Sequence, residues 1–575
     1  MGVSPLKTYG DKPYMNLSTL IEQSEVLKQV MASVSGPVTA NRVAKTLQAF
    51  LAQLDEQSSQ ENDESNRIFG LVLSEVERLS NQSEDFYLCL LSIHLLYGDR
   101  KQAVEGIVEY LSRAELSVQK HWFLYWQLCR FFFVNRVMFS EEFKYYCLNR
   151  VYKKVFSKYY AELERHRKRN DALMGAINQP ASQPCETQSS NQRIVLVTNQ
   201  FLGLKHAPTL LALNMAKTYI QLGFEVSIIN LAALPSEQTD VMFLGAVGFN
   251  QLEEYNGAGI DVTLLPEKRV VTRNGLPLNR ITYSGVEIPF YQLIEEQQQF
   301  ILASKLVETP PKLLMSVSDS NLFADAVARM AGESFPIITH PTSSGSPLTL
   351  FTQPLFLNHP VDGYVDSRGE NALELSRSYP KPFSYKALER ISVGFPEAKF
   401  LISLVGLRIS EEVDQSFLDL LHNLLSSNSQ IDVVVIGADA EQFAEYQIGM
   451  PERFHFVSFT SDLASLIAST DLFLNPDRMG GGTGAVMAMG AGVPVAALAR
   501  AYSDVAWWVQ DKFSFASIEE LFEYTKICAL DSEFYASQQQ LAREEYQQIT
   551  TRECSFKQIL IDCELLEASQ REVCE

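Results

Sequence analysis

The chain has 575 residues, of which 46% are hydrophobic and 20% charged, and a formal net charge of −21 at pH 7. This composition can build packed cores, which argues against a disordered protein, and the length predicts about three to four domains. Nucleic-acid binders usually present a basic face, so the acidic balance excludes nucleic acid as the expected main partner.

No apolar run approaches the roughly 20 residues that a transmembrane helix needs. The N-terminus lacks the basic and apolar regions of a secretory signal. The eight cysteines are scattered and form no CxxC pair, so neither a zinc ribbon nor a disulfide framework is expected. We therefore expect a cytoplasmic protein without a transmembrane segment.

Residues 1–170 are predicted to form an all-α domain. Apolar residues recur at helical spacing over 43–54, 68–79, 86–97 and 103–111. Ser140 is expected to cap a long helix that ends at about Arg169. No clean 34-residue period supports a helical repeat array. Residues 171–191 are rich in Gln, Ser, Pro and Asn and are predicted to be an interdomain linker.

From residue 192 the periodicity changes to alternating strands and helices, which is typical of parallel sheets. Residues 192–385 are expected to form one Rossmann-like domain, with an inserted antiparallel hairpin over 268–288. Its predicted strands are Arg193–Thr198, Val226–Leu231, Val262–Leu265, Lys312–Val317 and Pro336–Thr339.

Residues 386–575 are expected to form a second Rossmann-like domain that ends in helices. Its predicted strands cover 400–406, 432–437, 454–459, 471–475 and 493–498. Ligands of open α/β sheets bind at the carboxyl ends of the strands, so a cleft is expected between the two domains. The helical tail from about Ser517 could pack across both.

A glycine-rich turn in the second domain carries the strongest functional signal. A predicted strand ends at Asn475 and Pro476, the turn contains Gly480, Gly481 and Gly482, and Thr483 and Gly484 open a helix. Exposed N–H groups at such a helix start suit a diphosphate, and the Thr483 hydroxyl can add a donor. The alternative is a tight turn without a ligand. The Gly-Lys-Ser/Thr of a P-loop is missing.

This segment resembles the nucleotide-sugar motif of GT-B glycosyltransferases, and in pattern the bacterial adhesin-modifying N-glycosyltransferases, which are distantly related to O-GlcNAc transferase. The resemblance lies in Asn-Pro, then Gly, Thr and Gly before the helix, and Gly492 eight positions after Gly484. It implies an α/β protein of the GT-B fold, with two Rossmann-like domains facing a cleft after an all-α domain. Met479 and Met487 stand where many retaining relatives have glutamates, which favours inverting chemistry.

Three further segments extend the resemblance. It implies that His206, after the first strand, faces donor and acceptor as a general base, although a helix-capping or core histidine is the alternative. His340 and Thr342 resemble a His-Pro-Ala-Thr loop that could contact sugar or phosphate, unless they belong to a proline-rich connector. Arg408 is expected to neutralise the leaving diphosphate, or else to form a surface salt bridge.

Two aspartates are weaker candidates. Asp504 could accept hydrogen bonds from ribose hydroxyls, and Asp319 could orient a sugar or merely cap a helix. The expected site therefore combines His206 as the catalytic residue with a set of nucleotide-sugar contacts: Arg408, Asn475, Gly481, Gly482, Thr483, Gly484, His340, Thr342 and Asp504.

The resemblance implies an inverting, metal-independent glycosyltransferase that moves a hexose or N-acetylhexosamine from a nucleotide sugar, with UDP as the expected nucleotide. No Asp-x-Asp motif occurs in a suitable loop, so neither a metal nor another cofactor is expected. The helical domain would bind a protein acceptor, such as an adhesin or another surface protein before export. Two alternatives stay open: a non-catalytic GT-B-like accessory protein, and a nucleotide-sugar epimerase.

Overall fold

The structure is a computed structural model of the 575-residue chain. It describes residues 91, 94–95, 100–134, 139–176, 192–201, 207–231, 261–263, 270–271, 277–293, 296–343, 346–356, 373–374, 383–386, 388–407, 409–441, 450–458, 460, 462–500, 503–551 and 555–566. The helical faces predicted over 43–54 and 68–79 lie outside these residues. The chain divides into two compact units, Met1–Leu128 with Pro235–Phe249 and Cys129–Leu234 with Asn250–Glu575.

Among the described residues, the helices α6 (Arg100–Arg113), α7 (Val118–Val134) and α8 (Glu141–Ala176) precede the first strand. The apolar face predicted on α6 is buried, as expected. Ser140 accepts a hydrogen bond from Phe143 N at 3.2 Å, which confirms it as the cap of α8. This helix runs to Ala176, beyond its expected end at about Arg169 and into the predicted linker. None of the described helices is long and apolar enough to cross a bilayer.

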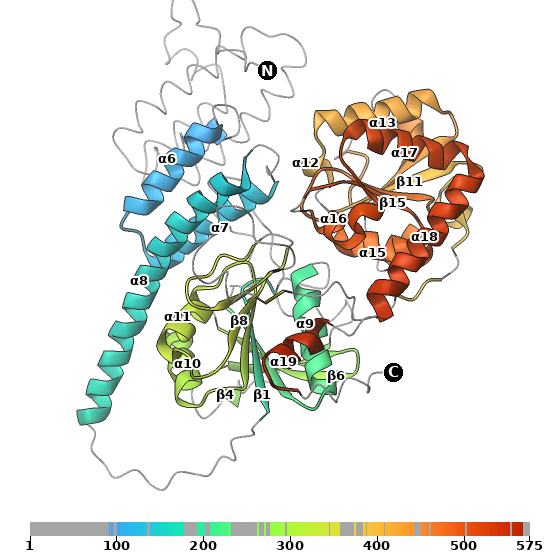
Figure 1. The fold of residues 1–575 in the computed structure, drawn as a ribbon. Coiled ribbons are helices and arrows are strands. Elements are labelled where there is room, and N and C mark those ends of the chain that lie inside the picture. Colours follow the sequence, from blue (N-terminus) through green and yellow to red (C-terminus); the bar gives the residue numbers. More distant parts are fainter. Residues whose placement is uncertain are drawn as a thin grey trace, which may run out of the picture. The chain divides into compact units, whose positions relative to one another are not determined.

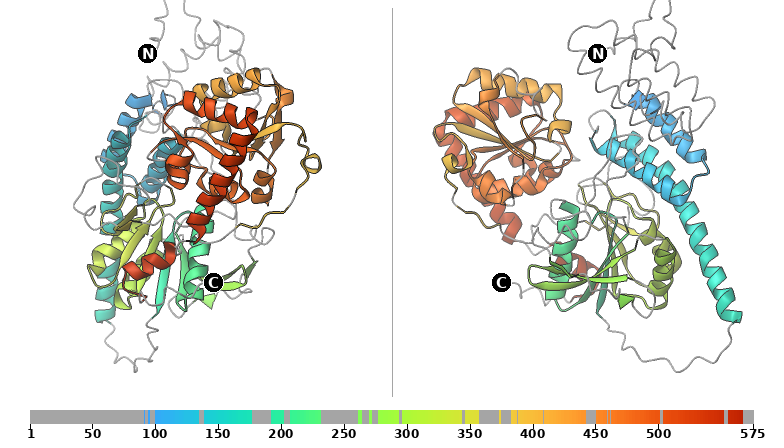
Figure 2. Two further views of the ribbon diagram at one scale, coloured as in Figure 1. Left: turned by 45° about the vertical axis from the view of Figure 1, so that its right-hand side comes forward. Right: turned by 180° about the vertical axis from the view of Figure 1, so that it is seen from behind.

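Three buried tyrosines of α8 fasten this helix to the first α/β domain. They are spaced by seven residues, so they lie on one side of the helix. The Tyr145 hydroxyl donates to Ser346 O at 2.9 Å, and the Tyr159 hydroxyl donates to Gln299 Oε1 at 2.9 Å. Between them, the Tyr152 hydroxyl donates to Asp325 Oδ2 at 2.6 Å. The last of the described N-terminal helices therefore packs with the first α/β domain (Figures 1 and 2).

The first α/β domain is built on a sheet with the strand order β10-β9-β8-β7-β1-β2-β6-β5-β3. Neighbours from β10 to β6 are parallel. Figure 1 shows α10 and α11 on one face of the sheet, and α9 on the other. The elements are β1 (Arg193–Thr198), α9 (Ala207–Gln221), β2 (Glu225–Asn230), β3 (Asp261–Thr263), β4 (Val270–Val271), β5 (Pro277–Tyr283), β6 (Val286–Gln292), α10 (Glu296–Glu308), β7 (Leu313–Val317), α11 (Leu322–Ala331), β8 (Ile337–His340), β9 (Gln353–Phe356) and β10 (Leu373–Glu374).

The antiparallel hairpin predicted over 268–288 exists, and both of its strands, β5 and β6, belong to the main sheet. Strands β5 and β6 pair antiparallel around Ser284 and Gly285, which both have positive φ. Strand β6 then pairs parallel with β2, with Phe290 opposite Ile228. The hairpin therefore extends the parallel sheet instead of standing apart from it. Strands β9 and β10 were not predicted, because both are short and β9 contains Pro354.

The second α/β domain has a six-stranded parallel sheet in the order β13-β12-β11-β14-β15-β16. This is the Rossmann order 3-2-1-4-5-6. The elements are β11 (Phe400–Val405), α12 (Ile409–Glu412), α13 (Gln415–Ser427), β12 (Ile431–Ile436), β13 (Phe454–Val457), α14 (Leu463–Ala468), β14 (Leu472–Asn475), α15 (Gly482–Ala491), β15 (Val495–Leu498), α16 (Asp504–Val509), β16 (Ser514–Phe515), α17 (Ile518–Leu530), α18 (Ser532–Thr551) and α19 (Ser555–Asp562).

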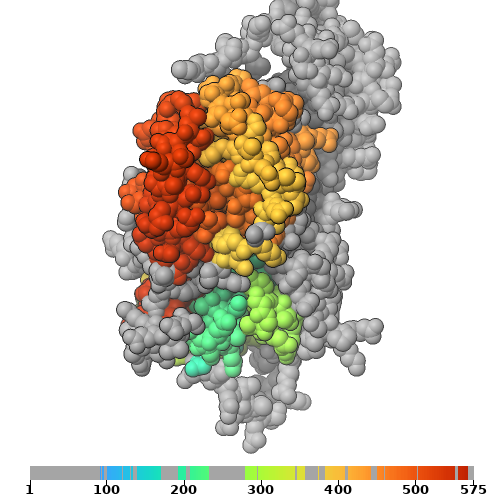
Figure 3. Space-filling view, turned by 90° about the vertical axis from the view of Figure 1, so that its right-hand side faces the viewer, coloured from blue at the N-terminus to red at the C-terminus, as the bar shows by residue number. Residues whose placement is uncertain are grey.

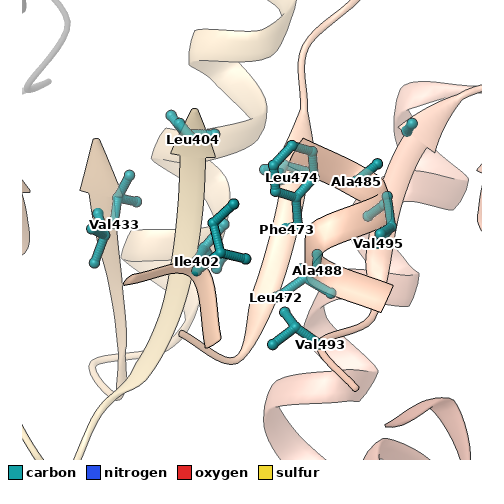
Figure 4. Packing of buried hydrophobic residues seen from close by; sticks show 14 of the residues in the cluster. Ile402, Leu404, Val433, Leu472, Phe473, Leu474, Ala485, Ala488, Val493 and Val495 are labelled. Atoms are coloured by element: carbon teal, nitrogen blue, oxygen red, sulfur yellow. The ribbon is translucent and has the colours of Figure 1, made fainter. Parts of the chain in front are cut away.

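Continuous apolar strands build the core of the second domain, because helices cover both faces of the sheet. Figure 4 shows Ala485 and Ala488 of α15 packed on Leu472 of β14 and Val495 of β15. The small alanines let the helix lie close to the sheet. This packing positions the first turn of α15 at the carboxyl ends of the strands.

The C-terminal helices divide between the two α/β domains. Helices α17 and α18 pack on α13 and α15 and cover one side of the second domain (Figure 3, red). Helix α19 packs instead on α9, with Phe556, Ile559 and Leu560 buried in the core of the first domain. The predicted fold class, two Rossmann-like domains after helices as in the GT-B fold, is confirmed for the described residues. The cleft between the domains stays a prediction.

Candidate functional site

The second sheet reverses its strand order between β11 and β14. In open α/β sheets this reversal is the place where the loops diverge and ligands bind, beyond the carboxyl ends of the strands. Strand β14 ends at Asn475 and leads into the glycine turn, and its neighbour β11 ends at Val405. The predicted phosphate-binding turn therefore lies at the switch point of the sheet.

Helix α15 begins directly after the glycine turn. Its N-cap is Gly481, which has φ +102° and makes no side-chain capping hydrogen bond. The first N–H groups of a helix have no partner within the helix, and together with the helix dipole they attract anions. Thr483, the second residue of α15, is half-buried beside them. The turn can therefore offer backbone donors and a hydroxyl to a phosphate.

Packing within the protein explains why three positions at the turn and the start of α15 must be glycine. A Cβ on Gly481 would lie 2.4 Å from Asn475 Oδ1, and one on Gly484 would lie 2.9 Å from Phe473. A Cβ on Gly482 would lie 2.8 Å from Asp504 Cβ. At Gly480, in contrast, a Cβ would meet no atom within 4 Å. Contacts within the protein are therefore enough to require glycine at Gly481, Gly482 and Gly484. The predicted reason for these glycines, close approach of a ligand, is not needed to explain them.

Asn475 is 1% exposed, and both polar groups of its side chain have partners in the protein. Its Nδ2 donates to Pro476 O at 3.0 Å, and its Oδ1 accepts from Arg478 Nε at 2.9 Å. The structure thus gives Asn475 a role in fixing the turn, and its predicted contact with a nucleotide sugar stays a prediction.

Arg478 is the residue that the sequence analysis missed. Its side chain is 5% exposed and forms an ion pair of 2.9 Å with Glu412 of α12. It also donates to Asn475 and to Val405 O. The available signal was a charged residue inside the predicted phosphate-binding turn, directly after Asp477, where a buried charge requires a partner.

Asp504 lies next to the glycine turn. It is the first residue of α16, its N–H donates to Met479 O at 2.8 Å, and its Cβ faces Gly482. The structure therefore brings together Asp504 and the start of α15, as a ribose contact would require. Trp508, one turn further along α16, also lies against Gly482.

The two methionines at the glutamate places of retaining relatives are apolar packing residues here. Met479 is 3% exposed, and Met487 packs against the core of the second domain. Neither position supplies a carboxylate to the turn. His206 and Arg408 lie outside the described residues, so their predicted roles stay predictions. Leu407, directly before Arg408, is 55% exposed.

A second polar group of residues lies at the carboxyl edge of the first sheet, where β8, β7 and β1 are neighbours. Asp319, after β7, accepts a hydrogen bond from Thr342 N at 2.8 Å, and Thr342 Oγ1 donates to Gln200 Oε1 at 3.3 Å. Burial raises the pKa of Asp319, while the bonds from Thr342 and the charge of Lys144 oppose that rise. The helix-capping role considered for Asp319 belongs to Asn321, which accepts from Ala324 N.

His340 ends β8 and is 2% exposed. Its Nδ1 lies 2.7 Å from Pro341 O, so the ring donates its Nδ1 proton there and leaves Nε2 as an acceptor. This Nε2 is buried and has no hydrogen-bond partner among the described residues. Burial lowers the pKa of His340 to about 4, so the ring is neutral near pH 7. The structure thus places His340 and Thr342 on one loop, held by Asp319.

Within the described residues, no group of three or more His, Cys, Asp or Glu side chains is arranged to hold a metal ion. The expected absence of a metal requirement stays a prediction.

Comparison with known proteins gives distant structural likenesses. No protein-family model matches the sequence, and no curated protein matches it. A mutant O-GlcNAc transferase from Thermobaculum terrenum is similar at 12% identity and a TM-score of 0.48, over 96% of this chain and 98% of that one. The Anabaena protein HepE in complex with UDP has 14% identity and a TM-score of 0.43, over 65% and 100%. A Rickettsia africae glycosyltransferase has 11% identity and a TM-score of 0.43, over 66% and 100%. Likenesses at this level assign no family to the chain.

Proposed function

We propose that this protein is a glycosyltransferase that transfers a hexose or N-acetylhexosamine from a nucleotide sugar, with UDP as the nucleotide. One observation carries the proposal. The glycine turn leads into α15 without a side-chain cap from Gly481, at the switch point of a Rossmann-ordered sheet. A dianionic diphosphate is a ligand whose charge and size fit such a helix start.

Each candidate residue has a distinct task in this proposal. The N–H groups at the start of α15 and the Thr483 hydroxyl would bind the diphosphate, and Arg408 would neutralise charge as the sugar–phosphate bond breaks. Asp504, which lies against Gly482, would accept hydrogen bonds from the ribose. His206 would take the proton of the acceptor in an inverting, metal-independent reaction.

The acceptor is proposed to be a protein, on the strength of the resemblance to adhesin-modifying enzymes. The neutral His340 and the loop through Thr342 lie at the carboxyl edge of the first sheet, where a GT-B enzyme would receive an acceptor. A cytoplasmic location, before export of the acceptor, is part of the same proposal.

Calorimetric titration with UDP tests the proposal directly. We expect binding that is unchanged by EDTA and weakened by Arg408→Ala. A panel of UDP- and GDP-sugars then identifies the donor, because a ligand at 100 times its Kd adds about 2.7 kcal/mol to stability and raises the melting temperature. Absence of UDP binding at millimolar ligand would overturn the proposal.

A second candidate is a non-catalytic GT-B-like protein that binds a partner. The burial of Met479 and the core packing of Met487 favour it, since neither turn position provides a reacting carboxylate. Product analysis separates the candidates. A glycosyltransferase releases UDP in the presence of an acceptor, an epimerase converts the UDP-sugar without one, and the non-catalytic protein leaves the donor unchanged.

A further inference from the structure

Arg478 connects the loops that leave the two central strands of the second sheet. From the β14 side, its Nε donates to Asn475 Oδ1 at 2.9 Å. Toward the β11 side, one terminal nitrogen donates to Val405 O and the other to Glu412 Oε2 at 2.9 Å. Val405 is the last residue of β11, and Glu412 is the last residue of α12. The guanidinium therefore bonds to both ends of the segment that joins these two residues.

Two neighbouring glycines leave the space that the side chain of Arg478 fills. A Cβ on Gly406 would lie 2.3 Å from Arg478 Nη1, and a Cβ on Gly481 would lie 2.9 Å from Nη2. The N-cap of α15 and the first residue after β11 therefore both pack directly on the guanidinium. Any displacement of Arg478 changes the space between these two loops.

Only arginine satisfies this geometry. Its planar fork carries donors on three nitrogens in fixed directions, whereas lysine presents one ammonium group on a flexible stem. The charge is balanced by Glu412, and both side chains are at most 5% exposed. A guanidinium so enclosed acts on a ligand through the loops that it holds.

On the basis of the proposed function, we propose that Arg478 is a positioning residue for the diphosphate site. It fastens the β11–α12 connection to the glycine turn and sets the direction of the first N–H groups of α15. The N-cap Gly481 has no side chain, and a Cβ there would lie against Nη2 of Arg478, so the position of the guanidinium limits where the N-cap can lie.

Arg453 offers a matched control in the same domain. It too is a mostly enclosed arginine, which bonds Asp432 Oδ1 at 2.7 Å and donates to Asn428 O at 2.9 Å and Leu425 O at 3.3 Å. It precedes β13, so it lies at the amino edge of the parallel sheet, opposite the glycine turn. Its loss should affect stability without affecting the diphosphate site.

The experiment compares UDP affinity by calorimetry for the wild type, Arg478→Lys and Arg453→Lys, at a temperature where circular dichroism shows each to be folded. We expect Arg478→Lys to weaken UDP binding by about 10- to 100-fold, because small displacements of binding groups have effects of this size. Arg453→Lys should bind UDP like the wild type even where its melting temperature falls equally. Added guanidinium should restore binding to Arg478→Ala, and added ammonium should not.

Wild-type affinity in Arg478→Lys, or equal weakening in Arg453→Lys, would overturn the role of Arg478 while the proposed function stands. Absence of UDP binding by the wild type would overturn the proposed function itself. If Arg478→Lys does not fold, Glu412→Gln replaces it. That variant keeps the shape of the side chain but removes the charge that orients the guanidinium, so we expect weaker UDP binding, and wild-type affinity there overturns the positioning role.

Discussion

The hydroxyl of Tyr152 on α8 donates a hydrogen bond of 2.6 Å to the carboxylate of Asp325 on α11. The same carboxylate accepts from the N–H groups of Leu350, Phe351 and Thr352. One buried aspartate therefore joins the long helix before the linker to the loop that precedes β9. This makes α8 part of the first α/β domain rather than a freely hinged arm.

Tyr152→Phe is expected to destabilise the protein by about 1–3 kcal/mol, because it leaves a buried carboxylate short of one donor. Tyr146→Phe is the control, since Tyr146 lies on the same helix and is 63% exposed. Chemical denaturation of both variants measures the difference. Equal stability of the two variants would show that the Tyr152–Asp325 bond contributes nothing to the docking of α8.

The glycine turn allows a sharp comparison between neighbouring residues. Gly481→Ala is expected to cost about 3 kcal/mol or more, because it forces an alanine to a positive φ and its Cβ against Asn475 Oδ1. Gly480→Ala should leave the melting temperature nearly unchanged, because its Cβ would enter open space. Thermal unfolding of both variants checks this. A large loss of stability in Gly480→Ala would contradict the described turn.

His340 is expected to make the protein less stable in mild acid. Its pKa is lowered to about 4 in the folded state. Between that value and the ordinary histidine pKa of about 6.5, the unfolded chain therefore binds a proton that the folded one does not. Stability should fall as the pH drops through this window, by up to about 3 kcal/mol. Urea titrations from pH 7 to pH 4.5 should show a shallower fall for His340→Gln than for the wild type.

Helix α19 should be needed for the stability of the first α/β domain. Phe556 is 3% exposed, packs in the core of that domain and lies 6.4 Å from the ring of His340. Phe556→Ala is expected to cost about 3–5 kcal/mol. The exposed Phe351 gives a control variant, Phe351→Ala. Hydrogen exchange shows which domain is affected, and unchanged protection of β1 and β7 would contradict the packing.

Local patterns in the sequence were enough to predict many of the strands, the glycine turn and one helix cap. Short continuous apolar runs predicted the strands that became β1, β11 and β14, because strands covered on both faces bury every side chain. The glycine turn and the helix after it were also predictable, since glycine, threonine and a following helical segment are adjacent in the chain. Ser140 was recognised as a cap for the same reason.

Contacts between residues distant in the chain could be decided only by the tertiary structure. The bonds from Arg478 to Val405 and Glu412 span 73 and 66 residues, and the Tyr152–Asp325 bond spans 173. The spacing of apolar residues in the sequence cannot predict such pairings, because they depend on which strands become neighbours. The order that places β14 beside β11 turned a lone arginine into the link between two loops, and the return of α19 to α9 placed a C-terminal phenylalanine beside His340.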